Sequence, residues 1–147
     1  MKREESYMNE FLSYVHMAAN VYRIYQQKTA DLRIKSMISG FADALSDHES
    51  KVKEVINDLG YNYTNSLKMM QKMALTMERL KNKMINDDFT LCMNMLKTTH
   101  MGIYQALNFI GKHNNLDARF IDVCENIIKE YDVIADKTRD FIENNYL

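Results

Sequence analysis

The chain has 147 residues, of which 46% are hydrophobic, and this is enough for one compact domain with a buried core. We therefore expect residues 1–147 to form a single domain. Lysine and arginine total 19, aspartate and glutamate total 20, and the resulting net charge of -1 argues against a general nucleic-acid-coating protein. The chain has no proline, no tryptophan and only 4 glycines, which excludes Gly/Pro-rich linkers and most turn-dense all-β folds and favours an all-helical protein.

Two amphipathic helices are predicted in the first 60 residues. The first covers about residues 4–28, and apolar residues recur along it at alternating spacings of three and four. This seam comprises Met8, Phe11, Val15, Ala18, Tyr22 and Tyr25. Thr29 or Asp31 can cap the second helix, which ends at Gly60, a residue suited to the left-handed conformation after a helix. The seam of the second helix comprises Ile34, Ile38, Phe41, Leu45, His48, Val52, Val55 and Leu59.

A connector is predicted over residues 61–66, where Ser66 can cap a third helix over about residues 67–85. The apolar face of this helix comprises Met70, Met73, Met77, Leu80 and Met84. Its opposite face is basic, with Lys68, Lys72, Arg79, Lys81 and Lys83 against Glu78. Because no aromatic residues interleave with these charges, we interpret this face as solvated and expect no nucleic-acid partner.

The last two predicted helices begin after residues 86–88, Asn86-Asp87-Asp88, and after a polar turn at residues 111–115. The seam of the fourth helix comprises Phe89, Cys92, Leu96, Thr99, Ile103, Ala106 and Ile110. The seam of the fifth comprises Ile121, Cys124, Ile128, Tyr131, Ala135, Thr138 and Ile142. Both cysteines lie on these seams and outside any CxxC spacing, so we expect buried free thiols.

The lengths of the predicted helices determine the expected architecture. Four of them have about 25 residues, or roughly 35 to 40 Å, and the short links within the first and last pairs predict two antiparallel hairpins. The segment from residue 61 to 87 is long enough to return the chain to the opposite end of the bundle. Two hairpins joined by a long crossover, with the third helix lying along the outside, form the ferritin-like variant of the four-helix bundle.

Local sequence cues occur at residues 19–25, Ala19-Asn20-Val21-Tyr22-Arg23-Ile24-Tyr25, and from residue 41 to 60. The second stretch contains Phe41-Ala42-Asp43-Ala44-Leu45-Ser46-Asp47-His48-Glu49 and ends in Asp58-Leu59-Gly60. With these features the chain resembles the ferritin-like superfamily, particularly rubrerythrin-related bacterial proteins and an uncharacterised bacterial family with a short helix in the crossover. The resemblance covers most of the chain. It implies two iron or manganese ions held by a Glu on each of two helices and a Glu-x-x-His on each of the other two.

The predicted seams place few metal-binding groups at the six ligand positions that the resemblance implies. These positions are Ala18, Leu45, His48, Thr99, Ile128 and Tyr131. Of these, His48 alone could bind a metal in the usual way, and one imidazole is too little for a hard divalent ion. The carboxylates that flank the seams are expected to point about 100° away, toward solvent or helix interfaces. They are Asp47, Glu49, Glu130 and Asp132. We therefore expect no di-metal centre, no cofactor and no catalytic residue.

The histidines allow two further interpretations. We expect His48 to be a core or edge histidine in a polar cluster with Tyr22, Thr99 or Tyr131, because an unpaired buried imidazole costs about 1 to 3 kcal/mol. Replacing it with Leu is then expected to leave metal content unchanged and stability unchanged or higher. His16, His48 and His100 together would suffice chemically for zinc, but their predicted heights agree only partly, and His16 and His100 are expected at the boundary of the bundle.

The methionines, glycines and tyrosines indicate possible surfaces and cavities. Met69 and Met95 fall off the predicted seams, so a twofold homodimer through the third and fourth helices is expected. Gly40 and Gly102 lie inside helices, where they permit close helix approach or leave a small cavity. Tyrosines spread along the bundle could line such a cavity, although core packing is the favoured interpretation. They are Tyr7, Tyr14, Tyr22, Tyr25, Tyr104 and Tyr131.

Three functions remain open at the level of sequence. No signal-peptide pattern and no apolar run of roughly 20 residues occur, so we expect a soluble cytoplasmic protein without a membrane partner. The favoured hypothesis is a non-catalytic, dimeric binding or structural protein. The alternative is a ferritin-like oxidase, peroxidase or iron-binding protein with iron or manganese at a displaced site. A carrier of small apolar ligands that uses the Met and Tyr residues is the third.

Overall fold

Five helices account for most of the chain in the computed structural model, which describes residues 2–64 and 67–147. They are α1 (Lys2–Gln26), α2 (Leu32–Asp58), α3 (Leu67–Asn82), α4 (Asp88–Lys112) and α5 (Ala118–Tyr146). The described residues contain no strand, and the predicted all-helical fold is confirmed. Within these residues, every helix is too short or too polar to span a lipid bilayer.

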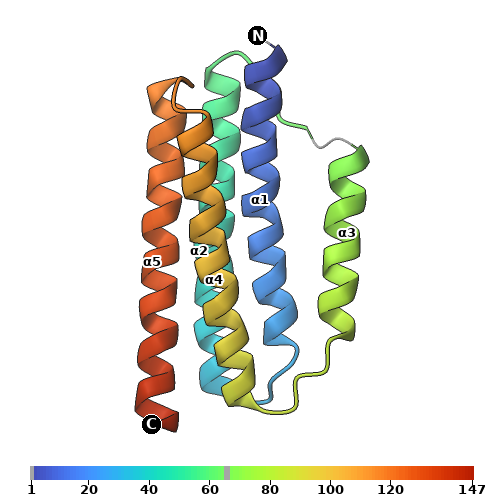
Figure 1. The fold of residues 1–147 in the computed structure, drawn as a ribbon, viewed down its shortest axis with the longest axis vertical. Coiled ribbons are helices and arrows are strands. Elements are labelled where there is room, and N and C mark those ends of the chain that lie inside the picture. The colour runs from blue at the N-terminus through green and yellow to red at the C-terminus, as the bar shows by residue number, and fades with distance from the viewer. Residues whose placement is uncertain (1, 65–66) are drawn as a thin grey trace.

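The four long helices form a ring in which α1 contacts α2 and α4, and α5 contacts the same two helices (Figure 1). Neighbours in this ring run in opposite directions. The short helix α3 lies outside the ring against α1, and it carries the chain from the end of α2 to the opposite end of the bundle, where α4 begins. The predicted ferritin-like topology, with two hairpins and a long helical crossover, is confirmed.

The helix ends follow the predicted capping residues closely. The side chain of Asp31 accepts hydrogen bonds from two backbone N–H groups at the start of α2, and Asp87 accepts one at the start of α4. Gly60 has a φ of 87°, and the backbone bonds after α2 form a Schellman motif. The cap predicted at Ser66 lies outside the described residues. Asp117, which caps α5, was not among the predicted caps.

The core is continuous through all four long helices, and most of the predicted seam residues of α1 and α2 are buried in it. In α4, however, the buried stripe is displaced by one residue along much of its length. It comprises Leu91, Cys92, Met95, Thr99, Ala106 and Phe109. Leu96, Ile103 and Ile110 are only half-buried, and Phe89 is exposed and packs against Tyr146 at the end of the bundle. Met95 is fully buried, so the prediction that it contributes to a dimer surface is wrong.

The same displacement affects two of the predicted inward positions. Ala18 is half-buried whereas Ala19 is buried, and Ile128 is half-buried whereas Ile127 is fully buried. Each replacement exchanges one aliphatic side chain for another. The displacement therefore brings no metal-binding group into the interior at these positions.

The helix α3 is shorter and more exposed than predicted. It ends at Asn82, so Met84 lies in the following connection and is exposed, and Met70 is exposed as well. No residue of α3 is buried in the described structure, because this helix packs on α1 with one side only. Met73, Met77 and Leu80 form the half-buried side, as predicted.

Hydrogen bonds attach the two connections that flank α3 to the α1 hairpin. At one end the hydroxyl of Tyr61 donates to Glu4 at 2.7 Å, and the side chain of Asn9 bonds the backbone of residues 62 and 64. At the other end the Lys28 ammonium donates to the carbonyl oxygens of residues 81 and 83, at 3.1 and 2.8 Å. These bonds hold α3 beside α1.

Gly102 on α4 permits a close contact with α5. A Cβ atom at this position would lie 3.2 Å from the ring of Tyr131 on α5, which is tighter than an ordinary van der Waals contact. The ring therefore packs directly against the backbone of α4. A Cβ atom at Gly40, by contrast, would meet nothing within 4 Å.

The two glycines should respond differently to replacement by alanine. Gly40→Ala should raise the free energy of unfolding by about 0.5 to 1 kcal/mol, because alanine is favoured in a helix interior. Gly102→Ala should gain less or lose stability, because its methyl group would displace the Tyr131 ring. Urea unfolding of both variants measures the difference. Equal stabilisation at the two positions would show that the ring does not depend on the missing Cβ.

Candidate functional site

A hydrogen-bonded pair of hydroxyl groups lies at the centre of the bundle. Tyr22 on α1 bonds Thr99 on α4, and the Thr99 hydroxyl donates in turn to the carbonyl oxygen of Met95 at 2.8 Å. Both side chains are buried, and burial raises the pKa of Tyr22 well above its usual range. The pair is neutral at physiological pH, so this part of the interior carries no negative charge.

His48 faces a carboxylate across the interface between α2 and α5. Its Nε2 atom lies 3.7 Å from Glu130, and the side chains of the two residues are 15% and 22% exposed. Its Nδ1 atom is buried and makes no hydrogen bond to the described residues. Burial lowers the pKa of His48. This arrangement differs from the expected contact with Tyr22, Thr99 or Tyr131, because the side chain turns toward the helix interface, where charge is tolerated better than in the core.

The other histidines are also separated from the bundle centre. His16 bonds Glu49 on α2 and the amide of Asn20, and His100 on α4 is exposed. His16, His48 and His100 therefore do not converge on one site. Across residues 2–64 and 67–147, no group of three or more His, Cys, Asp or Glu side chains is arranged to hold a metal ion.

Among the described residues, the interior does not present the set of carboxylates that the resemblance implies for two metal ions. Hard divalent ions need several oxygen donors, together with groups that orient them. Glu49 on α2 and Glu130 on α5 are half-buried and pair with histidines. The inward hydroxyl groups of Tyr22 and Thr99 pair with each other.

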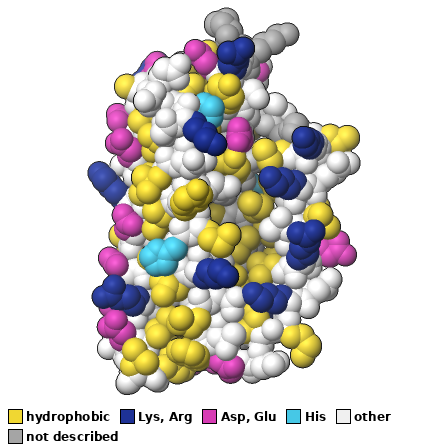
Figure 2. All heavy atoms as spheres, viewed as in Figure 1, with side chains coloured by type: hydrophobic (Ala, Val, Ile, Leu, Met, Phe, Trp, Pro, Cys, Tyr) yellow, Lys and Arg dark blue, Asp and Glu magenta, His cyan; other side chains and the backbone are white. Residues whose placement is uncertain are grey.

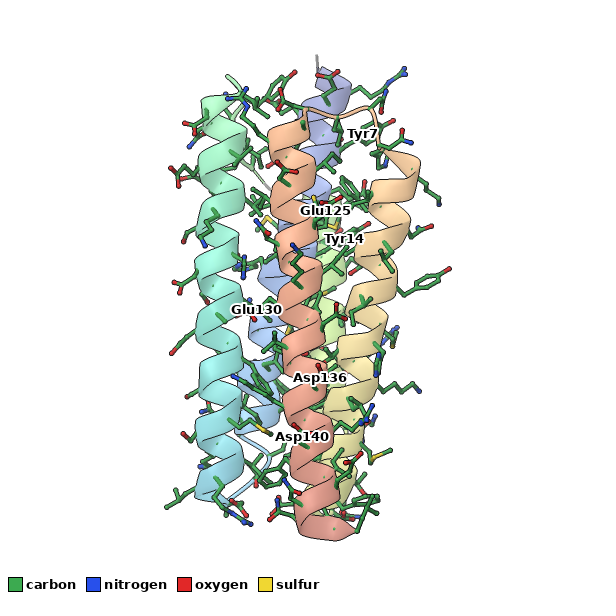
Figure 3. All side chains as sticks on the ribbon, turned by 90° about the vertical axis from the view of Figure 1, so that its left-hand side faces the viewer. Tyr7, Tyr14, Glu125, Glu130, Asp136 and Asp140 are labelled. Carbon is green, nitrogen blue, oxygen red and sulfur yellow. The ribbon has the colours of Figure 1, made fainter. Side chains whose placement is uncertain are left out.

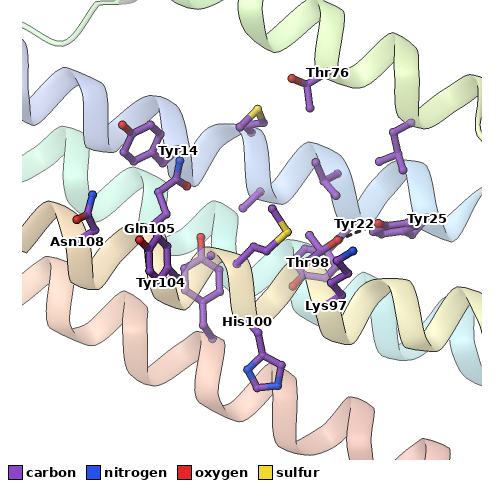
Figure 4. Close-up of a pocket in the computed structure, with 17 residues that line it drawn as sticks. Tyr14, Tyr22, Tyr25, Thr76, Lys97, Thr98, His100, Tyr104, Gln105 and Asn108 are labelled. Atoms are coloured by element: carbon purple, nitrogen blue, oxygen red, sulfur yellow. Dashed lines mark hydrogen bonds between the residues drawn. The ribbon is translucent and has the colours of Figure 1, made fainter.

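A cavity of about 860 Å³ opens beside this centre, between α1, α3 and α4 (Figure 4). Its floor reaches Tyr131 on α5, and α1 lines it from Tyr14 to Tyr25. The apolar side chains of its walls include Met17, Ala18, Val21, Leu80 and Met101. The cavity exists because α3 is held against α1 and leaves the adjacent surface of α4 uncovered.

Tyrosine rings from three helices line the cavity. The hydroxyl of Tyr14 bonds Glu10, and that of Tyr25 bonds Thr98 at 2.9 Å. The Tyr131 hydroxyl bonds no group in the described structure, although its side chain is almost completely buried. Burial is the main reason why the pKa values of Tyr14, Tyr22, Tyr25 and Tyr131 are raised. All four are neutral phenols at physiological pH and can act as hydrogen-bond partners to a ligand.

The outer side of the cavity is exposed and apolar along α4. Met101 and Tyr104, which line the cavity, are 63% and 73% exposed, and the neighbouring Leu107 is 56% exposed. Figure 2 shows apolar side chains gathered in the hollow between α4 and α3, with lysine and arginine side chains along α3. His100 is a further lining residue, and it points away from α1 (Figure 4).

The two cysteines are free and buried, as predicted, and neither lines the cavity. Burial raises the pKa of the Cys92 thiol to about 11 and raises that of Cys124 further. Both are therefore protonated thiols near neutral pH, which makes them poor nucleophiles and poor metal ligands.

Tyrosines that line this cavity were predicted from the sequence as possible cavity residues, but their packing in the core was the favoured interpretation. Five of the six tyrosines considered for a cavity line it, whereas Tyr7 instead stacks on His113 with a centroid distance of 4.0 Å. The cavity could not be predicted because it depends on the position of α3. The amphipathic pattern of α3 does not show which neighbouring helix it contacts.

Comparisons with known proteins agree with the observed topology. No protein family model matches the chain, and no curated protein matches it in sequence. Among solved structures, the chain is similar to the bacterioferritin-related protein from Bacteroides fragilis, described as a dodecameric thioferritin. The TM-score is 0.72 at 14% sequence identity, with 97% of this chain and 86% of that chain covered. At this identity the likeness shows the fold, which is ferritin-like.

Proposed function

We propose that this chain is a non-catalytic binding protein of ferritin-like fold and that its site is the cavity between α1, α3 and α4. The observation that carries this proposal is the cavity itself, lined by tyrosine and methionine side chains and open to solvent along α4. Its volume falls within the range of about 300 to 1,000 Å³ that is usual for small-molecule sites. The tyrosine rings supply apolar area, and their hydroxyl groups supply polar contacts.

A purely structural bundle offers a weaker account of this region. Packing α3 against both α1 and α4 would bury Met101 and Tyr104 and remove the cavity, with a gain of about 25 cal/mol for each Å² of apolar surface taken from water. The hydrogen bonds at both ends of α3 instead hold this helix on α1. An apolar ligand in the cavity would instead cover the apolar side chains that α3 leaves exposed.

Filling the cavity should weaken binding of a neutral apolar probe. Ala18 is half-buried and lines the cavity, so Ala18→Phe places a ring inside it and should weaken binding of N-phenylnaphthylamine by at least about tenfold, the equivalent of 1.4 kcal/mol. Fluorescence titration measures this affinity. The control is Ala74→Phe, at an exposed position of α3 that does not line the cavity. The site is wrongly assigned if Ala18→Phe binds as tightly as the unchanged protein while its helical circular dichroism is preserved.

We also propose that the protein has no di-metal centre and does not oxidise iron. Support comes from the interior donors, which are paired hydroxyl groups and interface carboxylates held by histidines. A ferritin-like oxidase, peroxidase or iron-binding protein with a displaced site is the competing function. A metal site of that kind would require these hydroxyl groups and carboxylates to leave their present partners and bind the metal.

Metal content separates the two functions. Protein purified without chelator should contain far less than one iron or manganese atom per chain by elemental analysis. His48→Leu should leave this value unchanged, and its stability should be equal or higher because the unpaired Nδ1 atom is removed. About two atoms per chain, or a loss of metal in the His48→Leu variant, would contradict the proposal.

We further propose that two copies associate through the exposed face of α4, next to α3. Met93, Met101, Tyr104 and Leu107 lie on this face and are all exposed, and a twofold dimer is the commonest way to cover such a surface. The structural neighbour is itself described as dodecameric.

Both thiols are unpaired, in keeping with a reducing compartment, and we place the protein in the cytoplasm.

A charge on α4 should break this association. Leu107 does not line the cavity, so Leu107→Glu should weaken self-association at least about tenfold and leave the cavity wall itself unchanged. Val133→Glu, at an exposed apolar position on α5, serves as the matched control. Sedimentation velocity over a concentration series measures both variants. A monomer at all concentrations, or equal effects of the two substitutions, would contradict the proposed interface.

A further inference from the structure

We infer that the ligand of this cavity is an elongated amphipathic anion, an aliphatic chain whose single carboxylate binds at Lys97. This inference rests on the proposed binding function and specifies the chemistry of the ligand. It is carried by the position of Lys97 at one end of an otherwise uncharged, apolar cavity.

Lys97 is the one lysine or arginine among the described lining residues, which include no aspartate or glutamate. It lies next to Thr98, whose hydroxyl bonds Tyr25, at the end of the cavity nearest the start of α4 (Figure 4). Its ammonium group makes no ion pair or hydrogen bond to the described residues. An uncompensated cation at the rim of an apolar cavity favours an anionic partner.

The surroundings of Lys97 reinforce this positive charge. The Lys83 ammonium donates to the amide oxygen of Asn94 at 2.6 Å, one turn before Lys97 on α4, and Lys28 donates to backbone carbonyl oxygens. Neither cation pairs with a carboxylate in the described structure. The helix α3, which forms the far wall, carries four basic residues against one acidic residue.

The nearby carboxylates are engaged elsewhere. Asp88 accepts a hydrogen bond from the Thr29 hydroxyl at 2.6 Å, and Asp87 caps α4. Glu10 bonds Tyr14 at the opposite end of the cavity. Further carboxylates lie on α5, where Figure 3 shows Glu125, Asp136 and Asp140 along the helix, away from α3. The positive end of the cavity is therefore not neutralised by these groups.

The shape of the cavity fits a long chain. Its lining follows α1 from Tyr14 to Tyr25, a distance of about 16 Å at 1.5 Å per residue. Between these two residues the wall is formed by Met17, Ala18, Val21 and Tyr22, and the Tyr22 hydroxyl is already bonded to Thr99. A carboxylate at Lys97 would leave an aliphatic chain lying along these side chains toward Tyr14.

Three compounds with the same tail and different heads test this inference. Dodecanoate, dodecanol and dodecylammonium are used to displace N-phenylnaphthylamine below their micelle concentrations at neutral pH. Dodecanoate should bind most tightly and dodecylammonium most weakly, and added salt should reduce this difference because it screens the charge on Lys97.

Substitution of the lysine assigns the effect to one residue. Lys97→Gln should weaken dodecanoate binding roughly three- to tenfold and leave dodecanol binding unchanged, as expected for a partly exposed ion pair. The control is Lys129→Gln, at an exposed position of α5 outside the lining, which should change neither affinity.

The outcomes separate this inference from the proposed function. Equal affinities for dodecanoate and dodecanol, or a Lys97→Gln variant that retains the preference for dodecanoate, would overturn the anionic ligand while leaving an apolar binding site in place. Failure of the neutral fluorophore and of all three compounds to bind would overturn the binding function and the inference together.

Discussion

The packing of the Tyr131 ring against the backbone of Gly102 is the contact on which the site depends. Because Gly102 has no side chain, α4 can present its backbone to α5 at the level of the bundle centre. The ring fills this space and also forms the floor of the cavity. A larger residue at position 102 would move the ring and alter the cavity, so the packing of the core and the shape of the site are coupled.

A second constraint is the cost of placing charge inside a four-helix bundle. Two metal ions would compensate several inward carboxylates, whereas without them the same carboxylates would be buried and unpaired. In this chain the inward polar atoms on α1 and α4 are neutral hydroxyl groups that bond each other. Glu49 and Glu130 lie at helix interfaces with histidine partners. In the described part of the chain, these polar groups are therefore paired with one another and are not left as unpaired charges.

The position of α3 follows from the same local interactions that determine the crossover. Polar groups near the start of α1 bind the connection that enters α3, and Lys28 binds the connection that leaves it. The helix has one half-buried side, which α1 occupies. The adjacent surface of α4 consequently stays open, and the exposed side chains of Met101 and Tyr104 form part of the wall of a cavity.

Most of the fold could be predicted from sequence, because alternating apolar spacings and capping aspartates are local signals. Asp31, Asp87 and Gly60 marked helix boundaries to within a few residues. The stripe on α4 differs from the prediction because Gly102, which packs against the Tyr131 ring, has no apolar side chain to indicate that its position faces α5. The contact of His48 with Glu130 could not be predicted, since it depends on the rotation of α2 relative to α5. The cavity depends on where α3 lies, which no residue pattern specifies.

The most direct test of the binding site is a crystal structure of the protein with N-phenylnaphthylamine bound. The account predicts electron density for the fluorophore between α1, α3 and α4, in contact with the side chains of Met101 and Tyr131. Density only on the outer face of α4, or a cavity closed by α3 packing onto α4, would contradict it.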